Sequence, residues 1–182
     1  MNIKQLAVNI IFICKNLRKI LTLSTEKEIA KILLRNAIKI ATAESCTGGL
    51  VSSRLTDVSG SSAYVFQNFV TYANEAKVKL LGVNRETIQR NGVVSSEVAL
   101  EMAEGLIERY DCTLAVSTTG IAGPLGATET KPVGLVYIGI ANKNKEQAYG
   151  YEANPLLYRP VMKYAFMLKT FELLLEFLKE NY

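Results

Sequence analysis

The sequence contains no histidine and no tryptophan among its 182 residues. The lack of histidine excludes the Ser-His and Cys-His pairs of many hydrolases, and it removes the commonest protein ligand of metal ions. The three cysteines, Cys14, Cys46 and Cys112, match neither the spacing of a zinc site nor that of a disulfide framework. We therefore expect a reducing, cytoplasmic location and no bound metal.

An excess of one sign of charge is also lacking, because 21 basic and 17 acidic residues leave a net charge of only +4. A positive net charge this small suits an anionic small-molecule ligand and is too weak to indicate nucleic acid as a partner. Hydrophobic residues make up 49% of the chain, so one domain with a substantial core is expected.

An apolar run at residues 6–14 lies between Lys4 and a basic cluster of Lys15, Arg18 and Lys19. The run is too short to cross a membrane. A targeting peptide is one interpretation, but the run has no clear small-residue cleavage site after it. An amphipathic helix or an extended start is the favoured alternative. We therefore predict an N-terminal extension at residues 1–22, a domain at residues 23–182, and no membrane partner.

Apolar periodicity predicts helices that alternate with strands along the chain. The predicted helices cover residues 24–35, 47–57, 74–82, 84–92 and 95–110, and a last helix starts near Pro160. The predicted strands cover residues 37–43, 63–72, 112–118, 133–141 and 147–153, the last two forming a hairpin. This order predicts an α/β fold with three α/β/α layers and a mixed, mainly parallel sheet.

The run Ala-Glu-Ser-Cys-Thr-Gly-Gly, which begins at Ala43, joins a predicted strand to a predicted helix. Such a turn exposes a side chain at the carboxyl end of a sheet and leaves backbone N–H groups unpaired. Ser45 would then be a nucleophile beside the N–H groups of Thr47, Gly48 and Gly49, which is what acyl transfer requires. The alternative for Ser45 is a helix cap.

Cys46 is a rival nucleophile in the same turn. The positive end of a helix would lower the pKa of its thiol and so favour the thiolate. The alternative is a buried cysteine that behaves as a small apolar side chain.

Lys77 is the candidate general base in this histidine-free chain. It falls in the first turn after a predicted Asn74 cap, where the positive helix end favours a neutral amine. A neutral lysine can accept a proton from a serine hydroxyl. Tyr72, at the end of the preceding strand, would relay a proton or hold the lysine in place. The alternatives are a solvated lysine and a tyrosine that packs on the core.

A Gly-rich loop follows the strand at 112–118 and contains Thr119, Gly120 and Gly123. Its glycines let the backbone approach a ligand, and its N–H groups can bind an anion. A tight structural connection is the alternative. Arg159, just before the C-terminal helix, is a candidate to hold a phosphate or carboxylate, or is a surface charge.

Five segments in order carry a family resemblance: residues 43–49, 69–77, 92–95, 119–124 and 131–134. Together they resemble the CinA C-terminal domain family over roughly residues 24–180. Stand-alone members of that family are nicotinamide mononucleotide deamidases. The resemblance therefore implies an anticodon-binding-domain-like fold, and hydrolysis of nicotinamide mononucleotide to nicotinate mononucleotide and ammonia without a cofactor.

The same resemblance implies roles for single residues. It makes Ser45 the nucleophile, with Lys77 and Tyr72 completing a histidine-free triad, and it makes Arg159 a contact of the substrate. A homo-oligomer is expected, with nicotinamide mononucleotide as the small-molecule partner.

The sequence departs from the family pattern around the expected substrate. The departures are Ala127 for a glycine, Leu135 for a threonine, Leu157-Tyr158 before Arg159 for Gly-Asp, and Lys163 for an arginine. They spare the three expected catalytic residues. They also motivate an alternative function, a pyridine-nucleotide-binding module without turnover.

Overall fold

Five strands form one mixed sheet in the computed structural model, which describes residues 2–182. The strands are β1 (Ile40–Glu44), β2 (Val65–Val70), β3 (Leu114–Gly120), β4 (Leu135–Asn142) and β5 (Glu146–Glu152), in the spatial order β2-β1-β3-β4-β5. β1 pairs in parallel with β2 and β3, whereas β4 pairs antiparallel with β3 and β5. Four strands therefore run one way and β4 runs against them, which confirms the predicted mainly parallel sheet.

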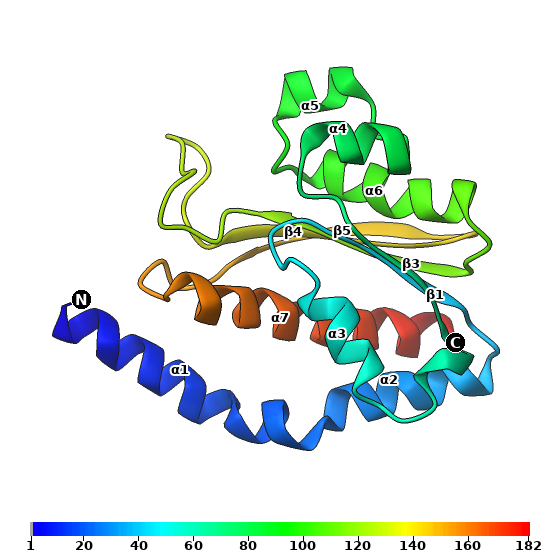
Figure 1. Ribbon diagram of the computed structural model, residues 1–182, viewed down its shortest axis with the longest axis horizontal. Coiled ribbons are helices and arrows are strands. Elements are labelled where there is room, and N and C mark those ends of the chain that lie inside the picture. The colour runs from blue at the N-terminus through cyan, green and yellow to red at the C-terminus, as the bar shows by residue number, and fades with distance from the viewer. Residues whose placement is uncertain (1) are drawn as a thin grey trace.

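Helices cover both faces of the sheet, as Figure 1 shows. One face carries α2 (Ser24–Arg35), α3 (Leu50–Thr56) and α7 (Arg159–Asn181), with α1 (Ile3–Thr22) lying beyond α7. The other face carries α4 (Asn74–Ala76), the π-helical turn η2 (Lys77–Leu81), α5 (Arg85–Asn91) and α6 (Ser96–Arg109). The three predicted α/β/α layers are confirmed.

Both faces of the central strands are buried, because each face packs on its own helical layer. All five residues of β1 are buried. Ile40 joins the apolar cluster under α7, while Ala41 and Ala43 join the cluster under α6. Helix α6 packs closely on β4, because a Cβ at Gly139 of β4 would overlap the Ala99 carbonyl of α6. The strand ends that carry polar residues are thereby held between two packed layers.

Two predicted boundaries differ from the structure around the expected site. The helix predicted from residue 47 begins at Leu50, because Gly48 and Gly49 take positive φ angles of 62° and 95° in a turn. The helix predicted at 74–82 is a single α-helical turn that continues as η2, and Ala73, not Asn74, is its N-cap residue. The Asn74 side chain makes no capping hydrogen bond there.

The N-terminal residues form α1, and a buried asparagine attaches this helix to the domain. The Asn9 amide donates to the Leu156 carbonyl at 3.0 Å, and its oxygen accepts from the Tyr158 N–H at 2.8 Å. At the other end of the helix, Arg54 of α3 donates to the Ile20 carbonyl at 2.5 Å. Thus α1 is bonded directly to the segment that leads into Arg159.

The substitution Asn9→Ala should destabilise the fold by about 1–3 kcal/mol, because it leaves two backbone groups between α1 and α7 without their partner. Asn16→Ala is the matched control. Asn16 lies on the same helix but donates only to the Phe12 carbonyl within it, so a change of less than about 0.5 kcal/mol is expected. Urea denaturation measures both values, and equal losses for the two variants would contradict the attachment.

Candidate active site

The candidate site lies at the carboxyl ends of the three parallel strands. Ser45 follows β1, Tyr72 follows β2, and Thr119 and Gly120 end β3. The connection from β1 to β2 passes through α3 on one face, and that from β2 to β3 passes through α4, α5 and α6 on the other. Ligands of open α/β sheets bind where the connections diverge in this way.

A pocket of about 290 Å³ opens at this edge of the sheet. Six of the predicted site residues line it: Ser45, Tyr72, Lys77, Thr119, Gly120 and Arg159. Four predicted residues, Thr47, Gly48, Gly49 and Gly123, are not among its lining. The rest of the wall is mainly apolar and includes Val93, Val94, Ile121 and Leu125. A planar apolar group with one polar end fits such a lining.

The Lys77 amine is the most unusual group in the pocket. Its side chain is only 1% exposed, and its Nζ donates to Ser45 Oγ at 3.1 Å and to the Thr71 carbonyl at 2.7 Å. Burial lowers the pKa of Lys77 from 10.5 to about 8. A pKa of about 8 leaves roughly a tenth of this amine neutral at pH 7, at hydrogen-bond distance from a serine hydroxyl.

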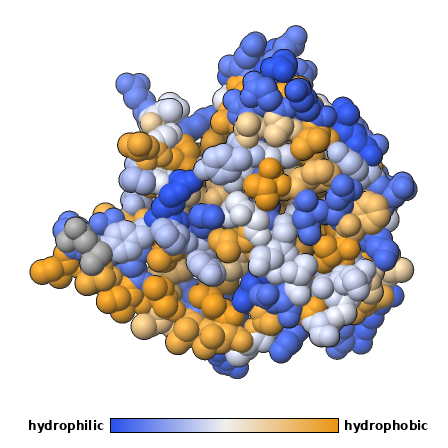
Figure 2. All heavy atoms as spheres, in the orientation of Figure 1, coloured by the Kyte–Doolittle hydropathy of each residue, from blue (hydrophilic) through white to orange (hydrophobic). Residues whose placement is uncertain are grey.

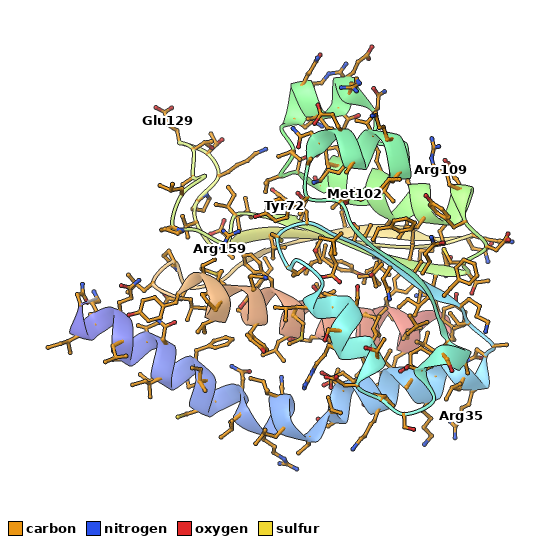
Figure 3. The ribbon with its side chains drawn as sticks, in the orientation of Figure 1. Arg35, Tyr72, Met102, Arg109, Glu129 and Arg159 are labelled. Atoms are coloured by element: carbon orange, nitrogen blue, oxygen red, sulfur yellow. The ribbon has the colours of Figure 1, made fainter. Side chains whose placement is uncertain are left out.

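Tyr72 reaches Lys77 through its backbone and not through its phenol. The Tyr72 carbonyl lies 3.4 Å from Lys77 Nζ, and the Tyr72 hydroxyl instead accepts from Arg159 Nη2 at 2.7 Å. Figure 3 shows the two labelled side chains, Tyr72 and Arg159, meeting at this end of the sheet. Arg159 Nη1 also donates to the Gly123 carbonyl at 2.8 Å. These two bonds leave three of the five guanidinium N–H groups for a ligand.

Glu44, the last residue of β1, holds the turn after Ser45 from within the protein. Its buried carboxylate accepts from the N–H groups of Gly49 at 2.9 Å, Val51 at 3.1 Å and Ser52 at 2.7 Å. These are the unpaired donors at the start of α3, and an anion there is stabilised by the helix dipole. Glu44 thus fixes the path of the turn that carries Ser45.

The expectation that three N–H groups of this turn face the pocket is wrong for two of them. Gly49 donates to Glu44, and Gly48 donates to the Ser45 carbonyl at 3.1 Å. Neither N–H is available to a ligand, because one acceptor lies within the turn and the other is the side chain of the last residue of β1. Within residues 2–182, the Thr47 N–H has no protein acceptor. The Thr47 side chain is buried, and its Oγ1 lies 2.8 Å from Thr118 Oγ1.

Comparison with known proteins places the chain in a family. The family model described as the CinA C-terminal domain matches residues 22–178. The chain belongs to the CinA family. A CinA-like protein of Chloroherpeton thalassium is 57% identical over 120 residues, which are 66% of this chain and 29% of that protein. A CinA-like protein of Chlorobium phaeobacteroides is 51% identical over 137 residues, which are 75% of this chain and 33% of that protein. The chain thus spans about a third of the length of these relatives.

Solved structures of the CinA family share the fold. The competence/damage inducible protein CihA of Agrobacterium tumefaciens is 38% identical, with a TM-score of 0.79 over 85% of this chain and 95% of that one. A CinA superfamily protein of Escherichia coli is 30% identical, with a TM-score of 0.75 over 83% of this chain and 87% of that one. The α/β fold expected from the sequence is the CinA fold.

In this CinA domain Cys46 lines the pocket but is poorly suited to attack a carbonyl. The residue is 5% exposed, and burial raises the pKa of its thiol to about 12. The thiolate, which is the reactive form, is therefore scarce at neutral pH. The structure favours the alternative in which Cys46 is a buried small side chain.

The sequence assigned no role at this site to three residues in or beside it. Glu44 belongs to the run that begins at Ala43, but a carboxylate at a strand end does not by itself indicate which N–H groups it binds. Asn74, expected to cap a helix, lines the pocket instead. Lys163 lies one helical turn after Arg159, and a Cβ at Gly48 would come within 3.1 Å of its Nζ. Lys163 therefore adds a second cation at the end of α7 that faces the turn.

We expect Glu44→Gln to destabilise the domain by about 1–3 kcal/mol. Both carboxylate oxygens of Glu44 accept from backbone N–H groups, and the amide NH2 of Gln would replace one of these acceptors by a donor. Glu129→Gln is the control, since Glu129 is exposed at the tip of the loop after β3 (Figure 3) and should change stability by less than about 0.5 kcal/mol. Urea denaturation compares the two, and an unchanged free energy of unfolding for Glu44→Gln would refute its role in holding the turn.

Proposed function

We propose that this CinA domain is an amidohydrolase that converts nicotinamide mononucleotide and water to nicotinate mononucleotide and ammonia. The observation that carries the proposal is the contact of 3.1 Å between Lys77 Nζ and Ser45 Oγ in a buried setting. A nucleophile within hydrogen-bond distance of a base with a pKa of about 8 is suited to acyl transfer near neutral pH. The family resemblance supplies the identity of the substrate.

The first half of the proposed reaction forms an ester on Ser45. Neutral Lys77 takes the proton of the Ser45 hydroxyl as Oγ attacks the carboxamide carbon of the nicotinamide ring. The carbonyl oxygen becomes an oxyanion beside the turn that follows Ser45, where the Thr47 N–H has no protein acceptor among the described residues. Lys77 then gives its proton to the amide nitrogen, the C–N bond breaks, and ammonia leaves. The ring remains bound as a nicotinoyl ester.

The second half releases the acid. Lys77, neutral again, takes a proton from a water molecule that attacks the ester carbon. The C–O bond to Ser45 breaks and the serine oxygen recovers the proton from Lys77. The carbonyls of Thr71 and Tyr72 accept from Lys77 Nζ at 2.7 and 3.4 Å, and they keep the amine directed at Ser45 in both halves.

Recognition of the nucleotide falls to the open side of the pocket. The Arg159 guanidinium is held by Tyr72 and Gly123, and Lys163 follows one turn later on α7. A guanidinium with free donors is suited to phosphate oxygens, and a lysine adds a point charge. The apolar wall that includes Val93 and Ile121 is placed to receive the pyridine ring. Tyr72 is 61% exposed and thus accessible to substrate.

The substitution Ser45→Ala should lower ammonia release from nicotinamide mononucleotide by at least about a thousandfold, because no ester can form. Cys46→Ala is the matched control at the next residue, and it should keep most of the activity. Free ammonia is measured with nicotinamide mononucleotide, nicotinamide riboside and nicotinamide as substrates. Activity on the nucleotide alone would support the phosphate contacts of Arg159.

Three outcomes would count against this proposal. Full activity of Ser45→Ala would exclude Ser45 as nucleophile, and loss of activity only in Cys46→Ala would make the thiol the nucleophile. A thermal shift with nicotinamide mononucleotide but no ammonia from the wild-type chain would favour the binding module without turnover.

The activity should rise with pH through the pKa of Lys77. The reactive form of Lys77 is the neutral one, so kcat/KM increases about tenfold per pH unit well below the pKa of about 8 and levels off above it. Initial rates of ammonia release across this range measure the profile. A rate that is flat through pH 8, or that falls as Lys77 loses its proton, would contradict the assigned base.

A further inference from the structure

Helix α1 has two apolar stripes, and only one of them packs on the domain. Val8 and Phe12 lie against the core, and Asn9 between them is buried. The second stripe is exposed and recurs every three or four residues, which places its members on one face of the helix. It consists of Ile3, Leu6, Ile10, Ile13, Leu17 and Leu21.

The exposed stripe forms a continuous apolar edge of the molecule. Figure 2 shows hydrophobic residues along the lower left border, where α1 lies in Figure 1. An apolar hollow between α1 and α7, lined by Leu17 and Tyr164 among others, extends this surface. Soluble proteins rarely leave a contiguous apolar face of this kind without a partner.

Positive charge accompanies the stripe. Residues 1–36 hold 7 of the 21 basic residues and 2 of the 17 acidic ones, a net charge of +5. The other 146 residues hold 14 basic and 15 acidic residues, a net charge of −1. The whole positive excess of the chain therefore lies in α1 and α2. Within α1 there are four cations and no acidic residue.

The cations of α1 are placed beside the apolar stripe. At 3.6 residues per turn, Arg18 falls about 60° beyond one edge of the stripe, and Lys4 and Lys15 follow at about 100° and 120°, with the exposed Ile11 among them. An apolar face flanked by Lys and Arg is the pattern of helices that lie in the interface of anionic bilayers. A second copy of this chain would fit the charge poorly, because pairing α1 with α1 would bring like charges together.

We propose that α1 docks this protein on anionic lipid surfaces, with its exposed stripe in the interface and its lysines and arginine against the headgroups. Among residues 2–182, no helix is long and apolar enough to span a bilayer, so α1 lies in the plane of the surface. No membrane partner is expected from the sequence alone. The exposure of the second stripe in the folded domain changes that expectation, and the docking does not depend on the chemistry at Ser45.

Vesicle sedimentation tests the proposal with the full chain. Vesicles of phosphatidylglycerol and phosphatidylcholine in equal parts should pull the protein down at low salt, whereas vesicles of phosphatidylcholine alone should bind much less. Salt of about 1 M shortens the Debye length to about 3 Å and should release most of the protein. Replacing both Lys15 and Arg18 by Gln should weaken binding roughly 25-fold, at about fivefold per cation.

The substitution Leu17→Asp tests the apolar part, and it should weaken binding by at least about tenfold. Phe66→Asp on β2 is the matched control, because Phe66 and Leu17 are both 45% exposed. Circular dichroism of each variant establishes that it folds.

Failure of the wild-type chain to bind anionic vesicles would overturn the proposal, as would equal binding by Leu17→Asp. A dimer that Leu17→Asp dissociates, in a chain that ignores vesicles, would assign the stripe to a second copy instead.

Discussion

The site depends on the burial of one amine without a counter-ion. Lys77 Nζ is surrounded by two backbone carbonyls and the Ser45 hydroxyl, and within residues 2–182 no carboxylate lies within ion-pair distance of it. A buried ammonium without a carboxylate is costly, so burial lowers the pKa of Lys77 to about 8 and raises the neutral share of the amine. In the proposed reaction, this neutral share lets a histidine-free chain offer a base to Ser45.

The rest of the fold serves to hold this pair. β1 and β2 are parallel neighbours, so the residues after them, Ser45 and Tyr72, emerge at the same edge of the sheet. Glu44 closes the turn after β1 on the start of α3, and the short α4 followed by η2 brings Lys77 back to the strand ends. Arg159 reaches the same edge from α7, and α1 fixes the segment before it through Asn9.

Much of this could be predicted because it depends on local pattern. Alternating strand and helix periods gave the layers, and the lysine near a helix start suggested a depressed pKa. The cause was different from the one expected: burial, and not the helix end, lowers the pKa of Lys77. The Tyr72 phenol was expected at Lys77 and lies at Arg159, because side-chain direction at a strand end depends on packing that no motif records. The Glu44 carboxylate accepts from the Gly49 N–H and the Ser45 carbonyl accepts from the Gly48 N–H, so two of the predicted oxyanion donors are already used. These bonds depend on the three-dimensional path of the turn, which the sequence does not record.

The most direct test of the account is the pKa of the Lys77 amine itself. Nuclear magnetic resonance of the chain with labelled lysine follows the side-chain shift at Lys77 against pH, and Lys77→Arg identifies the signal by its loss. We predict a titration midpoint near pH 8. A midpoint at the ordinary lysine value of 10.5 would leave less than about a thousandth of Lys77 neutral at pH 7, against about a tenth for a midpoint at pH 8, and it would contradict the proposed role of this residue as the base.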